Sequence, residues 1–146
     1  MKTLLHIGAG KIKHKGFINT DKNEMDISKL WPHNDSSVDG IISMCVFQCL
    51  LWKDLVVAFT EAYRVLKKGG LMRMGVFLED TKEPLDRFLY GDNINMFSFD
   101  LLRRVLVDRV GFSEIKLCKF RETAVTEFIP VDNRHKRGSS YVEVRK

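Results

Sequence analysis

Gly8-Ala9-Gly10, Asp21 and Asp26 are the residues whose types and order could bind a ligand in this chain. A glycine has no side chain, so the backbone at Gly8 and Gly10 can approach a ligand closely. The carboxylate of Asp21 could accept two hydrogen bonds from a ribose diol, and that of Asp26 could meet the amino group of an adenine. A Gly-x-Gly turn alone is more often only a turn. In this order, with each group at the end of a predicted strand, the residues favour a nucleoside ligand.

Strands and helices that alternate along the chain must position these residues. The apolar run at 3–7 stops at the glycines, as a buried strand does, and residues 38–44 are apolar on both faces, as in the middle of a sheet. Apolar residues at three- and four-residue spacing predict a helix over 51–68, which ends at Gly69-Gly70. The other predicted elements are strands at 17–20, 25–27, 71–78, 114–120 and 140–145, a helix at 101–110 capped by Ser98 or Asp100, and a lid-like loop at 79–97 with a helical turn at 85–90.

This alternation predicts an α/β fold: a doubly wound, Rossmann-like sheet, mostly parallel, with an antiparallel C-terminal strand. Ligands bind such sheets outside the carboxyl ends of the strands, near the switch in strand order. The glycine turn, the two aspartates and Ser43 all fall at that edge.

The length of 146 residues fits one globular domain, residues 1–146, with a core that needs neither disulfides nor metal. No apolar run approaches the roughly 18 residues of a membrane helix, and the first residues are too weakly apolar for a secretory signal. We therefore expect a soluble, cytoplasmic protein. The three cysteines should be reduced, buried thiols and not metal ligands, because no partner Cys or His pair lies at zinc-like spacing. The net charge of +5 permits nucleic-acid binding but does not indicate it.

Longer motifs carry a family likeness. They are Leu5-His6-Ile7-Gly8-Ala9-Gly10, Gly16-Phe17-Ile18-Asn19-Thr20-Asp21, Ser36-Ser37-Val38-Asp39-Gly40-Ile41-Ile42-Ser43 and, most clearly, Ala62-Tyr63-Arg64-Val65-Leu66-Lys67-Lys68-Gly69-Gly70. In these stretches the chain resembles the class I S-adenosylmethionine (SAM)-dependent methyltransferases, in particular the small type 11-like proteins often found among glycan-modification genes. The likeness extends over nearly the whole chain and ends near Asn133 to Glu143.

This resemblance implies a site for SAM or its product S-adenosylhomocysteine. Gly8, Ala9 and Gly10 would lie beneath the methionine part, and Asp21 would hold the ribose. Asp26 and Ile27 would border the adenine, and Ser43, Met44 and Cys45 would lie beside the sulfonium. No catalytic residue is identified, since His14 and His135 are expected to be surface residues in loops.

Several features depart from the family pattern. His6 stands where an acidic residue is usual, Ile12 replaces the third glycine, and Gln48 and Cys49 replace a common Glu and His pair. Only six residues separate Gly10 from Phe17, whereas a parallel crossover takes about 10 to 12 residues with its helix. The helices after the first two strands should be missing, and with them a helix N-terminus for the cofactor's carboxylate. Lysines at 11, 13 and 15 could replace part of that positive field, or form a solvated loop.

Missing helices would leave one face of the sheet without cover. Because large exposed apolar patches usually mark an interface, we expect a homodimer, with the segment 121–138 as the competing cover from within the chain.

Two functions remain open. The first is a SAM-dependent methyltransferase that acts on a small molecule or glycan. The second is a catalytically inactive methyltransferase-like protein that binds or scaffolds through oligomerisation. A nicotinamide-dependent oxidoreductase is disfavoured, because the glycine turn opens no long helix and Asp21 comes too early. RNA methylation lacks a basic face with interleaved aromatic residues.

Overall fold

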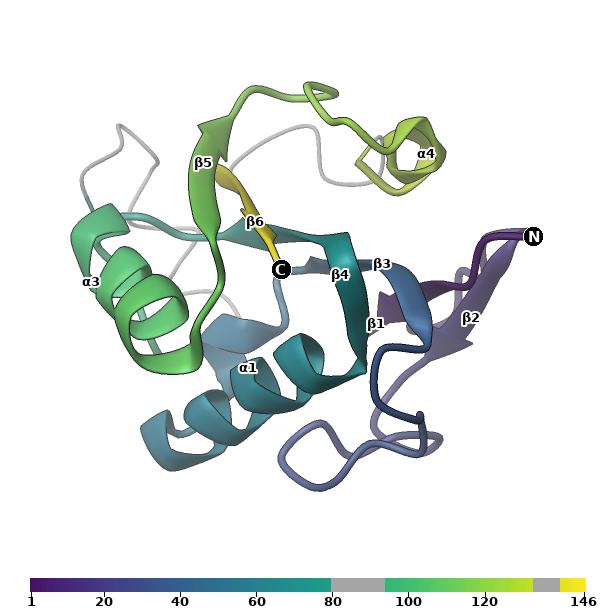
Figure 1. Cartoon of the computed structure of the whole chain (residues 1–146), viewed down its shortest axis with the longest axis horizontal. Coiled ribbons are helices and arrows are strands. Elements are labelled where there is room, and N and C mark those ends of the chain that lie inside the picture. Colours follow the sequence, from purple (N-terminus) through teal and green to yellow (C-terminus); the bar gives the residue numbers. More distant parts are fainter. Residues whose placement is uncertain (80–93, 133–139) are drawn as a thin grey trace.

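The computed structural model describes residues 1–79, 94–132 and 140–146. Within these residues, six strands form one sheet in the order β2-β1-β3-β4-β6-β5 (Figure 1). The strands β1, β2, β3 and β4 are parallel, while β6 runs antiparallel to both β4 and β5. This confirms the predicted fold class. The strand bounds are β1 Leu4–Ile7, β2 Phe17–Thr20, β3 Val38–Met44, β4 Leu66–Val76, β5 Glu114–Cys118 and β6 Ser140–Arg145.

The helical elements lie on both sides of this sheet, with α1 on one side and α4 on the other (Figure 1). As predicted, Ser98 caps the helix α3, and its side chain accepts a hydrogen bond from the Leu101 N–H at 3.1 Å. Gly111 ends the helical stretch that follows, with a left-handed φ of 109°. The helical elements described are η1 Phe47–Cys49, α1 Trp52–Val65, α3 Phe99–Arg103, η2 Arg104–Val110, η3 Thr126–Phe128 and α4 Ile129–Asp132.

Two predicted boundaries were wrong around the long helix. The helix α1 ends at Val65 and not at residue 68, and β4 begins at Leu66 and not at residue 71. Leu66 already pairs with Val38, and Lys67 Nζ reaches both Asp39 carboxylate oxygens at 2.8 Å. Cross-strand contacts therefore outweigh the local helical pattern. β4 ends at Val76, although Leu78 still forms an isolated bridge to Phe97.

The short strand predicted at 25–27 is also wrong: these described residues form turns. The N–H groups of Glu24 and Met25 both donate to the Asp21 carbonyl, at 3.1 and 2.8 Å. The described stretches between β1 and β2 and between β2 and β3 contain no helix, as the short spacings predicted. The predicted lid-like loop and helical turn lie mostly outside the described residues, as does His135.

The first face of the sheet is covered by apolar packing. Leu55, Ala58 and Phe59 of α1 are fully buried against strand residues such as Ile41 and Met72. The helices α3 and η2 extend the same cluster. This cover follows from the apolar stripe of α1, which the sequence shows at helical spacing.

The second face is covered by the segment 120–132, which is the cover from within the chain that the sequence left open. Phe128 and Val131 are fully buried against strand residues on that side. Gly40 lets the Phe128 ring pack closely there, because a side-chain Cβ would lie about 3.0 Å from Phe128 Cζ. An uncovered second face was the reason to expect a homodimer, and this segment removes it.

A buried arginine fastens this cover to the sheet. Arg73 of β4 is fully buried, and its guanidinium binds the Asp132 carboxylate through two hydrogen bonds of 2.9 and 2.7 Å. It also donates to Glu143 at 2.8 Å and to the backbone carbonyls of Lys119 and Glu122. Every N–H of the guanidinium therefore has a partner on β6, on the covering segment or at Lys119, which immediately precedes that segment.

Candidate functional site

A cavity of about 370 Å³ opens at the carboxyl edge of the parallel strands. Three short segments form it: the end of β1, the turn after β2 and the segment after β3. It lies next to the switch in strand order, where β1 has β2 on one side and β3 on the other. Its lining residues are Ile7, Gly8, Asp21, Lys22, Met25, Asp26, Ile27, Val46, Cys49 and Leu50.

Gly8 of the glycine turn lines this cavity. Gly8 has a left-handed φ of 71°, and a Cβ at this position would collide with the Val46 side chain. Gly10 also has a positive φ, of 58°. Ala9 is fully buried, and its N–H donates to the Thr20 carbonyl at 2.9 Å. The turn is thus fixed to the end of β2, which carries Asp21.

The two aspartates come from consecutive turns after β2. Asp21 accepts a hydrogen bond from the Asn23 N–H at 2.9 Å, and the Asp21 N–H donates to Glu24 at 2.9 Å. Hydrogen bonds from Asp21, with a smaller contribution from Lys13, lower the pKa of Glu24 to about 2. Asp21 is only partly buried, so its carboxylate borders the cavity and remains open to a ligand.

Asp26 is held by the residues that follow it. One carboxylate oxygen accepts hydrogen bonds from the Ser28 hydroxyl and N–H, at 2.6 and 3.1 Å, and the other lies 3.0 Å from Lys29 Nζ. These contacts, those of Ser28 foremost, lower the pKa of Asp26 to about 2. Asp26 is therefore ionised at any ordinary pH, and its orientation is fixed before a ligand arrives.

The three predicted residues at the end of β3 have different positions. Ser43 is fully buried and pairs in register with Ile7, the last residue of β1. Met44 points to the second face and packs in the cluster around Phe128. Cys45 has a left-handed φ of 58°, and its N–H donates to the Gly75 carbonyl at 2.8 Å. Of the nine residues predicted for the site, Gly8, Asp21, Asp26 and Ile27 line the cavity.

Sequence reasoning did not include the wall after β3. Val46 and Cys49 line the cavity from positions three apart around the 3-10 helix η1, and Leu50 follows them. Lys22 and Met25 lie between the two aspartates and line it as well. In the sequence, these lining residues were marked only by lying near the predicted ligand edge, because their residue types do not indicate a role. Gln48, which was noted only as a departure, is fully buried beside this wall.

The cavity has a charged end and a neutral end. Asp21, Lys22 and Asp26 all come from the turns after β2, while the wall after β3 contributes only uncharged side chains. In the ranges that the structure describes, no group of three or more His, Cys, Asp and Glu side chains could hold a metal ion. The three cysteines form no disulfide among the described residues, and burial raises the pKa of the Cys118 thiol.

His6, in place of an acidic residue, lies outside this cavity. Its ring Nδ1 lies 3.1 Å from the Asn19 side-chain oxygen, and its ring centroid lies 5.4 Å from that of His14. The Asn19 side chain also donates to the His14 and Phe17 carbonyls, at 2.9 and 3.0 Å. His6 therefore helps to hold the loop between β1 and β2 through its contact with Asn19.

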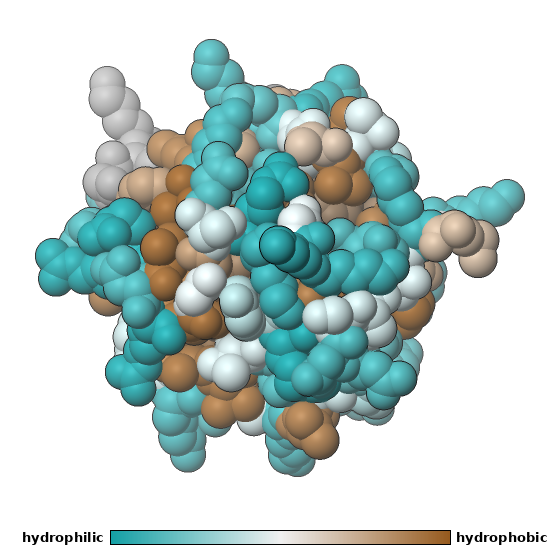
Figure 2. All heavy atoms as spheres, in the orientation of Figure 1, coloured by the Kyte–Doolittle hydropathy of each residue, from teal (hydrophilic) through white to brown (hydrophobic). Residues whose placement is uncertain are grey.

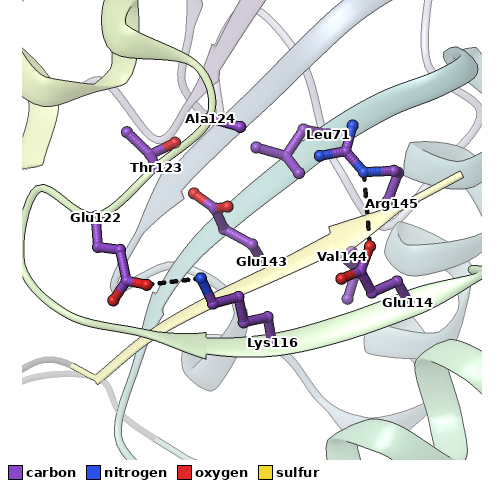
Figure 3. Close-up of a pocket in the computed structure, with 9 residues that line it drawn as sticks. All are labelled: Leu71, Glu114, Lys116, Glu122, Thr123, Ala124, Glu143, Val144 and Arg145. Carbon is purple, nitrogen blue, oxygen red and sulfur yellow. Dashed lines mark hydrogen bonds and ion pairs between the residues drawn. The ribbon is translucent and has the colours of Figure 1, made fainter.

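A second hollow of about 340 Å³ lies near β5 and β6, away from the carboxyl edge (Figure 3). Its walls carry three carboxylates, and each has a basic partner: Glu122 with Lys116 at 2.6 Å, Glu114 with Arg145 at 3.7 Å, and Glu143 with Arg73 at 2.8 Å. These groups satisfy one another, so this hollow does not require a ligand. The cavity at the carboxyl edge is the better candidate site.

Comparison with known proteins agrees with this architecture. A model of the methyltransferase domain family matches residues 3–74, which include β1, the glycine turn, both aspartates and most of β4. Over these residues and in its fold, the chain is similar to the class I SAM-dependent methyltransferases. The cofactor of that family is SAM. A search of the curated proteins finds no match.

Solved methyltransferases share the fold over their main domain. A SAM-dependent methyltransferase from Archaeoglobus fulgidus aligns with a TM-score of 0.72 at 17% identity, over 99% of this chain and 86% of that one. One from Thermotoga maritima aligns with a TM-score of 0.65 at 20% identity, over 100% of this chain and 83% of that one. The Haemonchus contortus phosphoethanolamine N-methyltransferase 2, solved with phosphomonomethylethanolamine and S-adenosylhomocysteine, aligns with a TM-score of 0.62 at 13% identity, over 100% of this chain and 49% of that one. At these low identities, the TM-scores establish a shared fold and no more.

Proposed function

We propose that the chain binds SAM in the cavity at the carboxyl edge and transfers its methyl group to a small molecule or glycan. The observation that carries this proposal is that Gly8 of the glycine turn and both aspartates line one cavity beside the switch in strand order. The volume of about 370 Å³ is within the usual range for small-molecule sites.

The residues present suit the cofactor. The turn at Gly8 provides a floor without a side chain, and Asp21 can accept hydrogen bonds from a ribose diol. The apolar side chains of Met25, Ile27 and Leu50 can pack against an adenine ring. Among the described residues, the Ser43 hydroxyl at the end of β3 and the Gln48 carboxamide in η1 are buried without a hydrogen-bond partner.

Catalysis in this site would come from positioning. When bound, SAM supplies an electrophilic methyl: the acceptor's lone pair forms a new bond to that carbon as the carbon–sulfur bond breaks, S-adenosylhomocysteine leaves, and the acceptor's proton passes to solvent. Asp21 and the glycine turn fix one partner, and the wall of Val46, Cys49 and Leu50 excludes water from one side. Holding two reactants in line can provide much of the rate enhancement in such a reaction.

A small acceptor is supported by the size of the cavity and by the fold neighbour from Haemonchus contortus, which was solved with a small phosphorylated amine. A glycan acceptor is supported by the sequence resemblance. No helix of the described segments is long and apolar enough to cross a bilayer.

An inactive binding or scaffold protein is the second candidate. It is supported by the cavity lining, which within the described residues includes no histidine to act as a base. It is weakened by the cover on the second face, which occupies the surface that such a scaffold would use. A homodimer would have to use exposed apolar residues such as Leu51 and Trp52. On the face of the molecule in Figure 2, apolar residues are interspersed with hydrophilic ones. Light scattering at micromolar concentration tests whether the homodimer forms.

Calorimetric titration tests the proposed function. We expect the wild type to bind both SAM and S-adenosylhomocysteine, and Asp21→Ala to lose at least about tenfold in affinity, because hydrogen bonds to a charged group contribute about 1.5–3 kcal/mol each. Asp108→Ala is the matched control, since Asp108 is an exposed aspartate on η2, away from the cavity. No heat from either ligand with the wild type would exclude the methyltransferase. Binding without methyl transfer to any acceptor would favour the inactive protein.

A further inference from the structure

A third hollow, of about 370 Å³, lies at the amino ends of β1 and β2. Leu4 and Phe17, the first residues of these strands, pair in register, and both line it. Ile7, at the other end of β1, lines the cavity at the carboxyl edge, about 10 Å further along the strand. This amino-end hollow therefore shares no lining residue with that cavity. Its remaining lining residues are His14, Lys15, Gly16, Glu127 and Pro130.

The missing helix after β1 leaves room for the amino-end hollow. The helix α1 connects β3 to β4 across the first face, and β2 lies on the other side of β1 from these two strands. Because parallel crossovers are right-handed, a helix between β1 and β2 would run the opposite way and cover the second face. The described residues there form turns without a helix. The space is bordered instead by the loop 14–16 and by Glu127 and Pro130 of the covering segment.

Apolar and aromatic side chains form one part of the wall. Leu4 is buried and Phe17 is half-buried, and both pack in the cluster of the second face. The Phe17 ring lies 6.4 Å from the His14 ring, edge-on, and 6.2 Å from the Phe128 ring. Pro130 contributes a further apolar ring. A wall of this kind suits the flat apolar body of a small molecule.

The charged groups of the lining leave one positive charge unmatched. Glu127 lies 2.8 Å from Lys2, and the hydrogen bond from Lys2 holds the pKa of the Glu127 carboxyl group below its ordinary value. Lys15 is exposed and, within the described part of the chain, has no carboxylate at ion-pair distance. A bound molecule with a single negative charge would match it.

His14 adds a hydrogen-bonding group that the fold does not use. Its Nε2 is buried and, among the described residues, has no hydrogen-bond partner, although most buried polar side-chain atoms have one. The backbone of His14 is fixed, because its N–H donates to the Asn19 side-chain oxygen and its carbonyl accepts from Asn19 Nδ2, each at 2.9 Å. The residue as a whole is half-buried and lines the hollow, so a molecule bound there would contact its ring.

We propose that the amino-end hollow binds a small aromatic carboxylate. The aromatic body would pack against Leu4, Phe17 and Pro130, and the carboxylate would accept hydrogen bonds from Lys15 and the His14 ring. Charge-assisted hydrogen bonds of this kind are stronger than those between neutral groups, which favours an acid over its neutral analogue. The proposal is independent of the proposed function, because it concerns a different space and a different ligand.

Amide NMR titration of the full chain tests this site with two probes of the same shape. The first, 2-naphthoate, carries a carboxylate, and the second, 2-naphthamide, is its neutral counterpart. We expect 2-naphthoate to shift the amide signals of Leu4, Gly16 and Phe17 to saturation and to bind at least tenfold more tightly than 2-naphthamide. No saturable shift of these signals at millimolar 2-naphthoate would overturn the site. Equal affinities for the two probes would overturn the assignment of a carboxylate ligand.

Two variants separate the polar contacts from packing. His14→Phe keeps an aromatic ring beside Phe17 and removes the ring nitrogens, and we expect it to weaken 2-naphthoate at least fivefold. Lys15→Gln should weaken it about threefold, because water screens an exposed ammonium. In both variants the preference for 2-naphthoate over 2-naphthamide should shrink, which a purely structural role would not produce. Lys11→Gln is the matched control, since Lys11 is an exposed lysine of the same loop that does not line the hollow.

The remaining outcomes are also decisive. An unchanged preference between the probes in both variants means that His14 and Lys15 do not bind the carboxylate. If His14→Phe does not fold, the exposed Lys15→Gln decides by the same comparison. Shifts at Gly8 and Ile27 in place of those at Leu4 and Phe17 would mean that 2-naphthoate enters the cavity at the carboxyl edge, and the proposal would then be wrong.

Discussion

Arg64 fastens an irregular segment of the chain to helix α1, and Arg73 fastens another to the sheet, at different depths. Arg64, near the end of α1, bonds Glu61, Asp35 and the carbonyls of Trp31 and His33, with 24% of its side chain exposed. Arg73 bonds its partners on the second face with none of its side chain exposed. The same guanidinium fork therefore organises both connections that lack regular structure.

The two arginines also differ in their relation to the candidate site. From Arg64, hydrogen bonds run through Glu61 and Trp31: the Trp31 N–H donates to Glu61 at 2.8 Å, and its indole N–H donates to the Ile27 carbonyl at 3.1 Å. Ile27 lines the cavity. Arg73 instead holds the segment that packs with Phe128 on the opposite face. Arg64 should therefore affect ligand binding and stability together, whereas Arg73 should affect stability alone.

Replacement of Arg73 is expected to have the largest effect. Arg73→Met leaves the fully buried Asp132 carboxylate without its partner, and breaking a buried ion pair from one side typically costs about 3–5 kcal/mol. Urea unfolding at pH 7 measures this free energy. At a temperature where the variant is folded, its affinity for S-adenosylhomocysteine should equal that of the wild type.

The double variant Arg73→Met with Asp132→Leu checks the cause. Removal of the Asp132 charge as well should recover part of the lost stability, because the fully buried carboxylate is then gone and only Glu143, 8% exposed, still lacks its partner. A double variant as unstable as Arg73→Met would show that the arginine contributes through packing, for example against the Tyr141 ring 4.7 Å away.

Replacement of Arg64 is expected to have a smaller effect on stability and a distinct one on binding. Arg64→Met removes hydrogen bonds that the solvent replaces in part, so we expect a loss of about 2 kcal/mol. Because the Trp31 segment is released, the affinity for S-adenosylhomocysteine should fall by about threefold to tenfold in calorimetry.

Arg104→Met is the matched control for this variant. Arg104 is 68% exposed and bonds only Asp100 at 2.8 Å, so its loss should change stability by about 0.5 kcal/mol or less. Unchanged ligand affinity in Arg64→Met would show that the hydrogen bonds from α1 do not affect the cavity wall.

The sequence was sufficient to predict the strands and helices where local patterns and the strand order agree. Apolar runs and glycine turns predicted β1, β2 and β3 closely, and the spacing alone predicted that no helix follows β1 or β2. It failed where distant contacts decide. Leu66 extends β4 backwards because it pairs with Val38, 28 positions earlier, and local helical periodicity carries no trace of that pairing.

The candidate site shows the same limit. Glycines and aspartates have side-chain chemistry that identifies them without a structure, whereas Val46 and Leu50 line the cavity only because η1 bends toward Gly8. Gln48 and Ser43 illustrate this further, since an absent hydrogen bond has no signature in a sequence. The position of Arg73 likewise depends on Asp132, which is 59 residues away.

The smallest expected effect is a pH dependence that belongs to Arg64. Hydrogen bonds from Arg64, opposed in part by burial, hold the pKa of Glu61 below its ordinary value of 4.5. A carboxyl group with a lowered folded-state pKa contributes stability above its unfolded pKa, and this contribution is lost as the pH falls through the folded one.

The difference in unfolding free energy between the wild type and Arg64→Met should therefore be constant from pH 7 to about 5 and shrink below about 4.5. Urea unfolding at intervals between pH 3 and pH 7 measures it, with Arg104→Met as the control that shows no such change. A difference that stays constant to pH 3 would mean that Arg64 acts through the carbonyls of Trp31 and His33 and not through Glu61.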